Sequence, residues 1–375
     1  MSQIIIEEEK LQHNIEIIKE KVQNQSDDKG NPLKIIAVLK GNAYGMGMKL
    51  VAQKLIDNNI NTFAVTEVDE ALELRELGFK NDILVLNATC IQEELIQIIE
   101  KDLIATVGSK EAIEKLNEIA KGKNKIARCH LKIDTGFSRF GFNILSDTEA
   151  DEIKEILKDK NNLKIEGTYS HFQESYANDE KRTREQLNKF LDAVEKLKAK
   201  NIETGILHIC NSAAFFKYPE MYLNAVRIGS AFSGRLQVSN PTGLQRVGYL
   251  ESQICEIRNL KKGDKIGYSG TCELKKETKV AIIEAGYADG IGVDGPKDSV
   301  RLIDKLRAIK TTLLRLTKNG TRYVEIQNKK CPILGRIGMK NMMVDISDCD
   351  AQIGDKVKIE LKLVLADSKI ERIIR

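Results

Sequence analysis

Short apolar runs alternate with amphipathic stretches along the first part of the chain. The stretches "MKLVAQKLI" and "DEALELREL" carry apolar residues at helical spacing, and the longer "DEKRTREQLNKFLDAVEKLKAK" has acidic residues near its start, as helices prefer. The apolar runs recur at intervals of roughly 20 to 40 residues, the spacing of consecutive βα units. The eight predicted strands are Ile35–Leu39, Thr62–Thr66, Asp82–Leu86, Leu103–Val107, Ala127–Ile133, Lys164–Ser170, Gly205–Ile209 and Ala225–Ile228.

Eight strand-then-helix units predict a (β/α)8 TIM barrel. The near-continuous apolar character of the strands agrees with this fold, because parallel strands in such folds are buried on both faces. A doubly wound open sheet is the alternative, but it does not by itself favour eight units. We therefore expect residues 1–237 to form an α/β barrel domain.

The pattern changes after about Leu236. Strand-like runs now follow one another directly, separated by Gly, Asp and Lys turns. This pattern predicts a second, mostly β domain over residues 238–375. The runs are "SQICEIRNL", "KVAIIEAGY", "TRYVEIQ", "CPILGRIG", "MMVDIS" and "DKVKIELKLV".

Composition narrows the class of protein. A chain of 375 residues exceeds the usual size of one core, which agrees with two domains. No apolar run approaches the roughly 18 residues of a membrane span, and the acidic N-terminus does not resemble a signal peptide. Lys and Glu are interleaved despite the net charge of +4, so no nucleic-acid-binding stripe is expected. Seven scattered cysteines without a CxxC pair predict free thiols in a reducing cytoplasm and no metal site.

Polar residues stand where the predicted barrel strands end. In a TIM barrel the active site is built at the C-terminal ends of the strands. We therefore expect one rim to hold Lys40 after the first strand, Lys132, Asp134 and Arg139 with the fifth, Ser170 and His171 after the sixth, Asn211 and Ser212 after the seventh, and Arg227, Gly229 and Ser230 with the eighth.

This rim suits an anionic cofactor that carries an aldehyde. A desolvated lysine amine has a depressed pKa and forms Schiff bases. Hydroxyl groups, backbone N–H groups and glycines bind phosphate, and pyridoxal phosphate combines both requirements. The small residues of "GNAYGMG" after Lys40 would leave room for such a group.

Each of these residues, taken alone, also has a purely structural interpretation. A lysine after a strand is commonly a solvated loop residue, and a single histidine is commonly a hydrogen-bonded structural one. His130 and His208 fall inside predicted strands and are interpreted as packing residues. Arg227 within an apolar run is harder to explain in this way, because a buried guanidinium needs polar partners.

The motifs "AVLKGNAYGMG", "HLKIDTGFSRFGF", "HICNSAA", "VRIGSAFSG", "KIGYSGT", "AGYADG" and "GRIGMKNMMVDI" occur in this order along the chain. With them the chain resembles, nearly end to end, the alanine racemase family of barrel-type (fold-type III) pyridoxal-phosphate racemases. The resemblance implies an isomerase that interconverts L- and D-alanine with pyridoxal 5'-phosphate. It also implies a head-to-tail homodimer that supplies D-alanine for peptidoglycan.

The resemblance assigns roles to individual residues. Lys40 would bind the cofactor covalently and act as one catalytic base, and Tyr268 would reach the site of a partner subunit as the opposite base. The resemblance further places Tyr44, Ser212, Gly229 and Ser230 at the phosphate and counts Asn211 among the cofactor-binding residues. It places Arg227 at the pyridine nitrogen, His171 in the supporting hydrogen-bond network, Arg139 at the phenolate oxygen and substrate carboxylate, Lys132 as a carbamylated residue that orients Arg139, and Tyr287 and Met339 at the substrate and its access corridor.

Two departures from the family pattern leave the substrate open. Gly338 and Lys340 stand where the family commonly has cysteine and aspartate. A racemase of serine or of a basic amino acid is therefore an alternative, although a positive charge at the pocket would repel basic substrates. A non-catalytic pyridoxal-phosphate carrier is a second alternative, but such proteins resemble the barrel alone, so the second domain and Tyr268 argue against it. A barrel-type decarboxylase shares the architecture but not these motifs.

Overall fold

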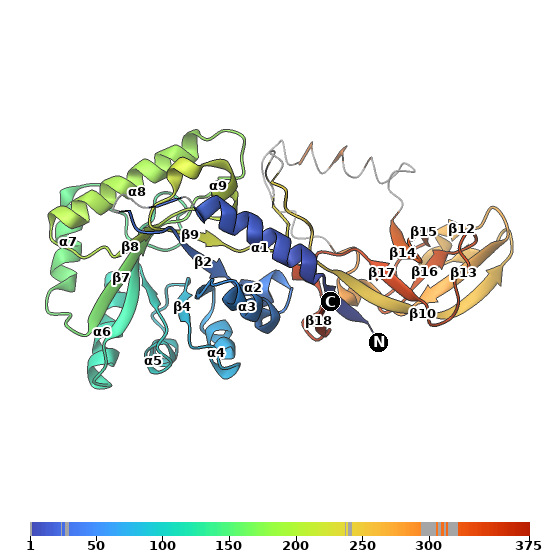
Figure 1. Cartoon of the computed structure of the whole chain (residues 1–375), viewed down its shortest axis with the longest axis horizontal. Coiled ribbons are helices and arrows are strands. Elements are labelled where there is room, and N and C mark those ends of the chain that lie inside the picture. Colours follow the sequence, from blue (N-terminus) through green and yellow to red (C-terminus); the bar gives the residue numbers. More distant parts are fainter. Residues whose placement is uncertain are drawn as a thin grey trace. The chain divides into compact units, whose positions relative to one another are not determined.

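The computed structural model describes residues 2–23, 25–26, 30–236, 238, 242–293, 305–306, 309–310, 313 and 322–375. These residues form two compact units (Figure 1). One unit comprises Glu9–Val247, and the other joins Met1–Glu8 to Gly248–Arg375. The domain boundary that we placed after residue 237 falls on a position outside the described residues and stays a prediction.

The first unit is the predicted barrel of eight parallel strands. Their order is β4-β3-β2-β9-β8-β7-β6-β5, and a bridge between Leu84 and Ile104 brings the two end strands together. Two backbone hydrogen bonds make this closure, from Val85 N to Ile104 O and from Ile104 N to Ile83 O, both 2.9 Å. The strands are β2 (Lys34–Val38), β3 (Thr62–Val65), β4 (Asp82–Val85), β5 (Ala105–Val107), β6 (Ala127–Lys132), β7 (Leu163–Tyr169), β8 (Ile206–His208) and β9 (Ala225–Ile228).

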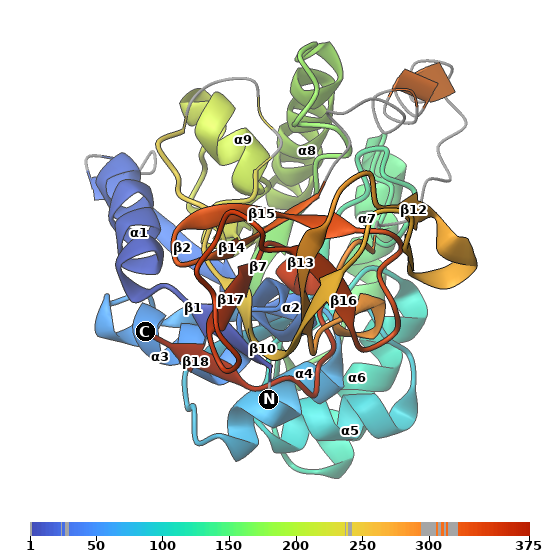
Figure 2. The ribbon, with the colours of Figure 1, turned by 90° about the vertical axis from the view of Figure 1, so that its right-hand side faces the viewer.

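Helices follow most of these strands and bury their apolar faces. Local signals set the helix starts: Ser109 caps α6 by accepting a hydrogen bond from the Ala112 N–H, and Ser146 forms a capping box with Glu149 at α7. Figures 1 and 2 both show α4 to α6 on the outside of the strands. The helices are α1 (Glu8–Gln23), α3 (Met48–Asp57), α4 (Val68–Glu76), α5 (Gln92–Glu100), α6 (Lys110–Gly122), α7 (Asp147–Leu157), α8 (Lys181–Ala199) and α9 (Ser212–Lys217). Within the described ranges, every helix is too short or too polar to serve as a transmembrane span.

One part of the barrel interior is apolar, and the neighbouring part is polar. Apolar side chains from β2, β3, β4 and β9 pack into one cluster, which includes Ile36, Ala64 and Leu84. Buried polar side chains come from the neighbouring part of the sheet, from β5 to β9, and include His130, Lys132, Thr106, His208 and Arg227. Buried polar groups need hydrogen-bond partners, so this half of the interior holds a connected network.

The second unit is the predicted β domain. Its strand order is β13-β16-β15-β14-β17-β10-β1-β18, and an additional pairing of β13 with β10 closes six of the strands on themselves. All pairings are antiparallel except that between β1 and β18. The strands are β1 (Gln3–Ile6), β10 (Tyr249–Leu260), β13 (Thr278–Ile283), β14 (Tyr323–Ile326), β15 (Lys329–Leu334), β16 (Met342–Asp345), β17 (Lys356–Ile359) and β18 (Arg372–Ile374).

The N-terminal strand β1 belongs to this second unit, although it precedes the barrel in sequence. Ile4 pairs with Leu250 of β10 on one side and with Arg372 of β18 on the other. The apolar start of the chain gave no indication of these partners, because both lie far along the sequence.

Candidate active site

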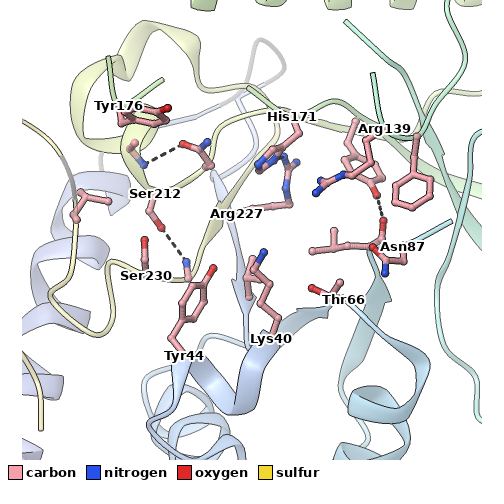
Figure 3. A pocket seen from close by; sticks show the side chains of 18 of the residues that line it. Lys40, Tyr44, Thr66, Asn87, Arg139, His171, Tyr176, Ser212, Arg227 and Ser230 are labelled. Atoms are coloured by element: carbon pink, nitrogen blue, oxygen red, sulfur yellow. Dashed lines mark hydrogen bonds between the residues drawn. The ribbon is translucent and has the colours of Figure 1, made fainter. Parts of the chain in front are cut away.

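A cavity of about 420 Å³ opens at the C-terminal ends of the barrel strands (Figure 3). Its lining comes from the ends of β2, β3, β4, β6, β7, β8 and β9 and from the loops that follow them. Most of the barrel residues that the sequence placed at the rim line this cavity: Lys40, Tyr44, Lys132, Arg139, His171, Asn211, Ser212, Arg227, Gly229 and Ser230. Asp134 and Ser170, which we also expected at the rim, are not among its lining residues.

The segment after Lys40 is a turn of left-handed helix, α2 (Lys40–Tyr44). Asn42, Ala43 and Tyr44 have φ values of 53°, 52° and 56°, a conformation that costs roughly 1–2 kcal/mol for each residue with a side chain. Two side-chain contacts hold the turn: the Gly41 N–H donates to Glu70 Oε1 at 2.6 Å, and the Met48 N–H donates to Asn42 Oδ1 at 2.6 Å. The small residues of this segment therefore do more than leave space, since they allow a strained turn that brings Lys40 and Tyr44 to one cavity.

Lys40 carries the reactive amine of the cavity. Its side chain is exposed within the open cavity, but the surrounding protein desolvates the amine. This desolvation lowers the pKa of Lys40, the positive charge of Arg139 lowers it further, and Glu70 partly opposes both effects. A lowered pKa increases the fraction of neutral amine, which is the nucleophilic form.

Tyr44, Ser212 and Gly229 form one corner of the cavity. The Gly229 N–H donates to Ser212 Oγ at 3.0 Å, and a Cβ at Gly229 would lie 2.4 Å from the Tyr44 hydroxyl oxygen. Glycine is thus required for the close approach of the tyrosine. Burial raises the pKa of Tyr44 to about 12, so its hydroxyl keeps its proton and remains a donor. Asn211 caps α9 beside this corner and accepts hydrogen bonds from the N–H groups of Ala213 and Ala214.

Arg227 is buried and held only by neutral groups. It donates to His208 Nδ1 at 2.6 Å, to His171 Nδ1 at 3.2 Å and to the Ser170 carbonyl at 2.7 Å. Among the described residues no carboxylate pairs with it. Burial lowers the pKa of Arg227 to about 10, so the guanidinium still carries its charge at neutral pH.

Lys132 is a second buried basic residue, and it forms no ion pair with a carboxylate in the described part of the chain. Its Nζ lies 3.5 Å from the Ile133 carbonyl oxygen and 4.6 Å from the centroid of the Tyr169 ring. Burial places the pKa of Lys132 well below its usual value of 10.5, with further lowering by Arg227 and Arg139. The lowered pKa increases the fraction of Lys132 that is a neutral amine.

The loop after β6 presents Arg139 to the cavity. Asp134 Oδ1 accepts hydrogen bonds from the N–H groups of Gly136, Phe137 and Ser138 at 2.9, 2.9 and 3.1 Å and so fixes the start of the loop. The guanidinium carbon of Arg139 lies 4.5 Å from the centroid of the Phe137 ring. The loop formed by the motif "KIDTGFSRFGF" therefore holds Arg139 in place at the cavity.

Three predicted site residues belong to the second unit. Tyr268 lies in a short 3-10 turn, and Tyr287 lies in another. The Tyr287 N–H donates to the Gly338 carbonyl at 3.0 Å, so the turn of Tyr287 lies directly beside that of Met339. All three side chains are exposed, by 69% for Tyr268, 47% for Tyr287 and 57% for Met339.

Comparison with known proteins agrees with this geometry. Residues 6–237 match the model of the alanine racemase N-terminal domain, and residues 247–365 match that of the alanine racemase C-terminal domain. The chain belongs to the alanine racemase family. It is 32% identical to an alanine racemase of Methanococcus maripaludis over 330 residues, which cover 87% of this chain and 81% of that protein. It is 33% identical to one of Clostridium tetani over 359 residues, which cover 94% and 84%.

Solved structures of the alanine racemase family have the same fold. An alanine racemase of Clostridium difficile 630 matches with a TM-score of 0.86 and 27% identity, over 100% of this chain and 95% of that chain. A structure from Bacillus anthracis with bound L-Ala-P matches with a TM-score of 0.82 and 25% identity, over 100% and 95%. The chain is accordingly a racemase, and the predicted barrel followed by a β domain is confirmed.

Sequence reasoning did not single out Tyr169, which lines this racemase's cavity, and it interpreted His130 and His208 as packing residues. Tyr169 stacks on His208 with ring centroids 4.8 Å apart, and its hydroxyl group bonds to Thr106 Oγ1 at 2.8 Å. His130 bonds to His208 at 2.9 Å. The only signal for these residues was the presence of polar side chains in buried strands, which cannot tell a network from isolated packing residues.

Proposed function

We propose that this chain is a pyridoxal-phosphate-dependent racemase that interconverts L- and D-alanine. The observation that carries the proposal is the shared cavity of Lys40, with its lowered pKa, and Arg227, whose hydrogen-bond partners among the described residues are neutral. The named relatives support alanine as the substrate.

The residues of the cavity fit pyridoxal phosphate. Lys40 offers the amine for its aldehyde, and the corner of Tyr44, Ser212 and Gly229 offers hydroxyl and N–H donors for its phosphate. Arg227 offers a donor to the ring nitrogen. When bound, the cofactor supplies an electron sink that acidifies the Cα–H bond of an amino acid.

Inversion at Cα requires a base on each face of the substrate. Lys40 removes or returns the proton on one face, and Tyr268 of the partner subunit does so on the other. Arg227 has no acceptor atom, so it would donate to the ring nitrogen and keep that nitrogen unprotonated. An arginine at this position would thereby disfavour transamination.

Lys132 is proposed to be carbamylated. Its neutral buried amine would add carbon dioxide to form an N–C bond and release one proton, which gives a carbamate anion. The anion would place a negative charge near the positive charges of Arg227 and Arg139, and it would orient Arg139 toward the substrate carboxylate. His171 accepts a hydrogen bond from Arg227 and would support the same network.

We propose a head-to-tail homodimer as the working enzyme. Tyr268, Tyr287 and Met339 are large side chains exposed on one unit, as expected for groups that a second subunit covers. In this arrangement Tyr287 and Met339 would line the substrate's access corridor. A cytoplasmic location and a role in peptidoglycan synthesis go with this proposal.

Lys340 does not select the substrate in this proposal. Its Nζ pairs with Asp289 Oδ1 at 2.6 Å, and its side chain is 59% exposed. The charge that departs from the family pattern is therefore compensated inside its own unit, and it neither attracts nor repels basic amino acids at the site. Serine and basic amino acids remain the competing substrates.

The test of the proposed function is proton exchange at Cα. The purified protein with pyridoxal phosphate is incubated in D2O with L-alanine, L-serine, L-lysine or L-ornithine, and deuterium entry and D-enantiomer are measured. We expect both from alanine at the highest rate. Exchange with another member of the set would reassign the substrate, and no exchange with any of them despite bound cofactor would favour the carrier alternative.

A mixing experiment tests the shared site. Lys40→Ala and Tyr268→Phe chains are purified separately, each with little activity, and are then unfolded and refolded together. A mixed dimer has one site with both native residues, so we expect activity to return. Persistent inactivity of a verified mixed dimer would show that each subunit uses its own Tyr268.

A further inference from the structure

A line of three hydrogen-bonded side chains crosses the barrel interior away from the cavity. Arg227 Nη1 lies 2.6 Å from His208 Nδ1, and His208 Nε2 lies 2.9 Å from His130 Nδ1. The three residues come from β9, β8 and β6, and all are buried, with exposed fractions of 3%, 0% and 3%. We name this line the His130 relay.

In the intact His130 relay, the donors of Arg227 and the acceptor of His130 together determine where each ring proton lies. A guanidinium only donates, so His208 Nδ1 must accept, and a neutral His208 then carries its proton on Nε2. That proton points to His130 Nδ1, which must accept in turn, so His130 carries its own proton on Nε2. Burial lowers the pKa of His130 to about 4 and places that of His208 well below its usual value, in agreement with two neutral rings.

The backbone is adapted to the ring of His130. The pairing of β6 with β7 shifts by one residue between Cys129 and His130, so that His130 lies opposite Gly167. A Cβ at Gly167 would lie 2.7 Å from His130 Cε1. Irregular pairing of this kind re-aims a side chain, and the missing side chain of Gly167 makes room for it.

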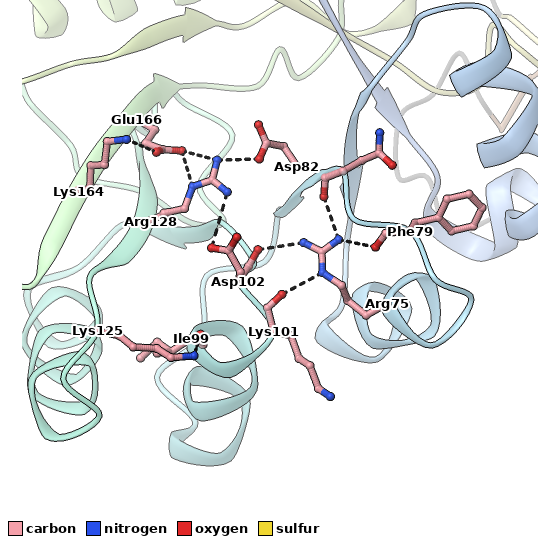
Figure 4. Close-up of polar contacts among 11 residues, drawn as sticks. Arg75, Phe79, Asp82, Ile99, Lys101, Asp102, Lys125, Arg128, Lys164 and Glu166 are labelled. Atoms are coloured by element: carbon pink, nitrogen blue, oxygen red, sulfur yellow. Dashed lines mark hydrogen bonds and ion pairs between the residues drawn. The ribbon is translucent and has the colours of Figure 1, made fainter.

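His130 also borders a second cavity of about 420 Å³, lined by residues that begin the barrel strands. Three ionic groups of this cavity pair with one another: Arg128 pairs with Asp82 Oδ1 at 2.7 Å and with Glu166 Oε2 at 2.9 Å (Figure 4). The His130 relay therefore joins the active-site rim to the opposite end of the barrel. The ion pairs at this end join β6 to β4 and β7.

We propose that His130 is a positioning residue for Arg227. By accepting from His208, it holds His208 in the tautomer that accepts from Arg227 and so sets the direction of the guanidinium. The consequence for catalysis rests on the proposed function, in which Arg227 faces the cofactor ring. Without the acceptor at His130, His208 would bury an unpaired N–H, and moving its proton to Nδ1 would place that proton against Arg227.

The first test is ¹⁵N NMR of the histidine rings in the full chain without substrate. The chain has only four histidines, so single substitutions assign the signals. We expect His130 and His208 to be neutral with the proton on Nε2. We expect His130→Leu to move the His208 proton to Nδ1 and His130→Asn, whose Oδ1 can replace Nδ1, to leave it in place. A wild-type His208 protonated on Nδ1, or no change in His130→Leu, would overturn the proposal, and the wild-type spectrum tests it even where a variant fails to fold.

The second test uses the holoenzyme. His130→Leu should lower kcat for alanine by about ten- to hundredfold with little change in KM, because Arg227 is misplaced while the substrate contacts remain. It should also increase transamination per turnover, and His130→Asn should restore both values. His13→Asn is the matched control, since His13 lies on α1 and bonds only to the Gly243 carbonyl among the described residues. Equal kinetics in His130→Leu and wild type would refute the positioning role, whereas an inactive wild type with the expected NMR tautomers would refute the proposed function alone.

Discussion

The two units of the molecule present their candidate residues in opposite ways. In the barrel unit, Arg227 and Lys132 are buried, and Arg227 is fixed by several hydrogen bonds. In the second unit, Tyr268, Tyr287 and Met339 are exposed. The barrel residues are thus preorganised by their own unit, while the residues of the second unit are surface groups there.

This difference indicates which functions of the site each unit can perform without a partner subunit. A network of buried donors and acceptors has few alternative arrangements, so the barrel half is expected to bind the cofactor without a partner. An exposed tyrosine has no such constraint. Its catalytic role depends on the proposed homodimer, and the predictions below test the two halves separately.

The largest expected effect is on the barrel half. Lys40→Ala should lower racemisation by about 10⁴-fold, the upper range for losing a positioned acid–base group, and should remove the covalent cofactor. Reduction with borohydride followed by mass spectrometry measures the covalent bond, and an alanine racemisation assay measures the rate. Lys49→Ala is the matched control, because Lys49 is an exposed residue of α3. Full activity of Lys40→Ala would remove Lys40 from the mechanism.

A smaller and directional effect is expected from the second unit. Tyr268→Phe should lower proton abstraction from one alanine enantiomer by about 10²-fold while sparing cofactor binding. Deuterium exchange measured separately from L- and D-alanine checks this asymmetry. Tyr323→Phe, at another exposed tyrosine of the same unit, should leave both rates unchanged. Equal losses in both directions would argue against a one-sided base.

Substitution of Lys132 tests how burial of its amine affects the stability of the barrel unit. Its folded-state pKa lies below that of the unfolded chain, so the unfolded chain binds more protons and wild-type stability rises with pH toward 10.5. The Lys132→Met variant has no amine to deprotonate on folding, so it should be more stable than the wild type at pH 7 by about 1 to 4 kcal/mol. This difference in stability should shrink as the pH approaches 10.5. Urea unfolding of the cofactor-free protein in carbonate-free buffer at several pH values measures it.

Added bicarbonate provides the control for this experiment. It should stabilise the wild type but not Lys132→Met if Lys132 forms a carbamate. A stability difference that does not vary with pH would show instead that Lys132 is charged in the folded protein.

The smallest effect is expected at Lys340. Lys340→Met should cost less than about 1 kcal/mol, because the pair with Asp289 is largely solvent-exposed on the lysine side. The ratio of kcat/KM for alanine to that for lysine should not change. Lys356→Met removes a similar exposed lysine from the half-buried Glu251 and is the matched control. A shift of this ratio in Lys340→Met alone would place its charge at the substrate after all.

Much of the fold was predictable because its signals are local. All eight predicted barrel strands occur within a few residues of their expected bounds, since continuous apolar runs separated by helical periods report burial directly. The residues that follow these strands were predictable as a group for the same reason: parallel strands in a closed barrel end at one rim.

Other features depended on partners far away in sequence. Gln3–Ile6 leaves the barrel and pairs with β10 and β18. The left-handed turn at Asn42 to Tyr44 opposes the ordinary preference of those residues and persists because Glu70, on another helix, binds the Gly41 N–H. Neither feature follows from a local pattern.

The sequence by itself determined the number of βα units, the change to a β domain and the set of polar residues at the strand ends. Only the tertiary structure decided that His130, His208 and Arg227 share one line of hydrogen bonds, and that Lys132 loses its solvent. The physical reason is that periodicity records which face of a segment is buried. Contacts across a barrel, and the pKa shifts that burial causes, are set by closure and register between strands distant in the chain.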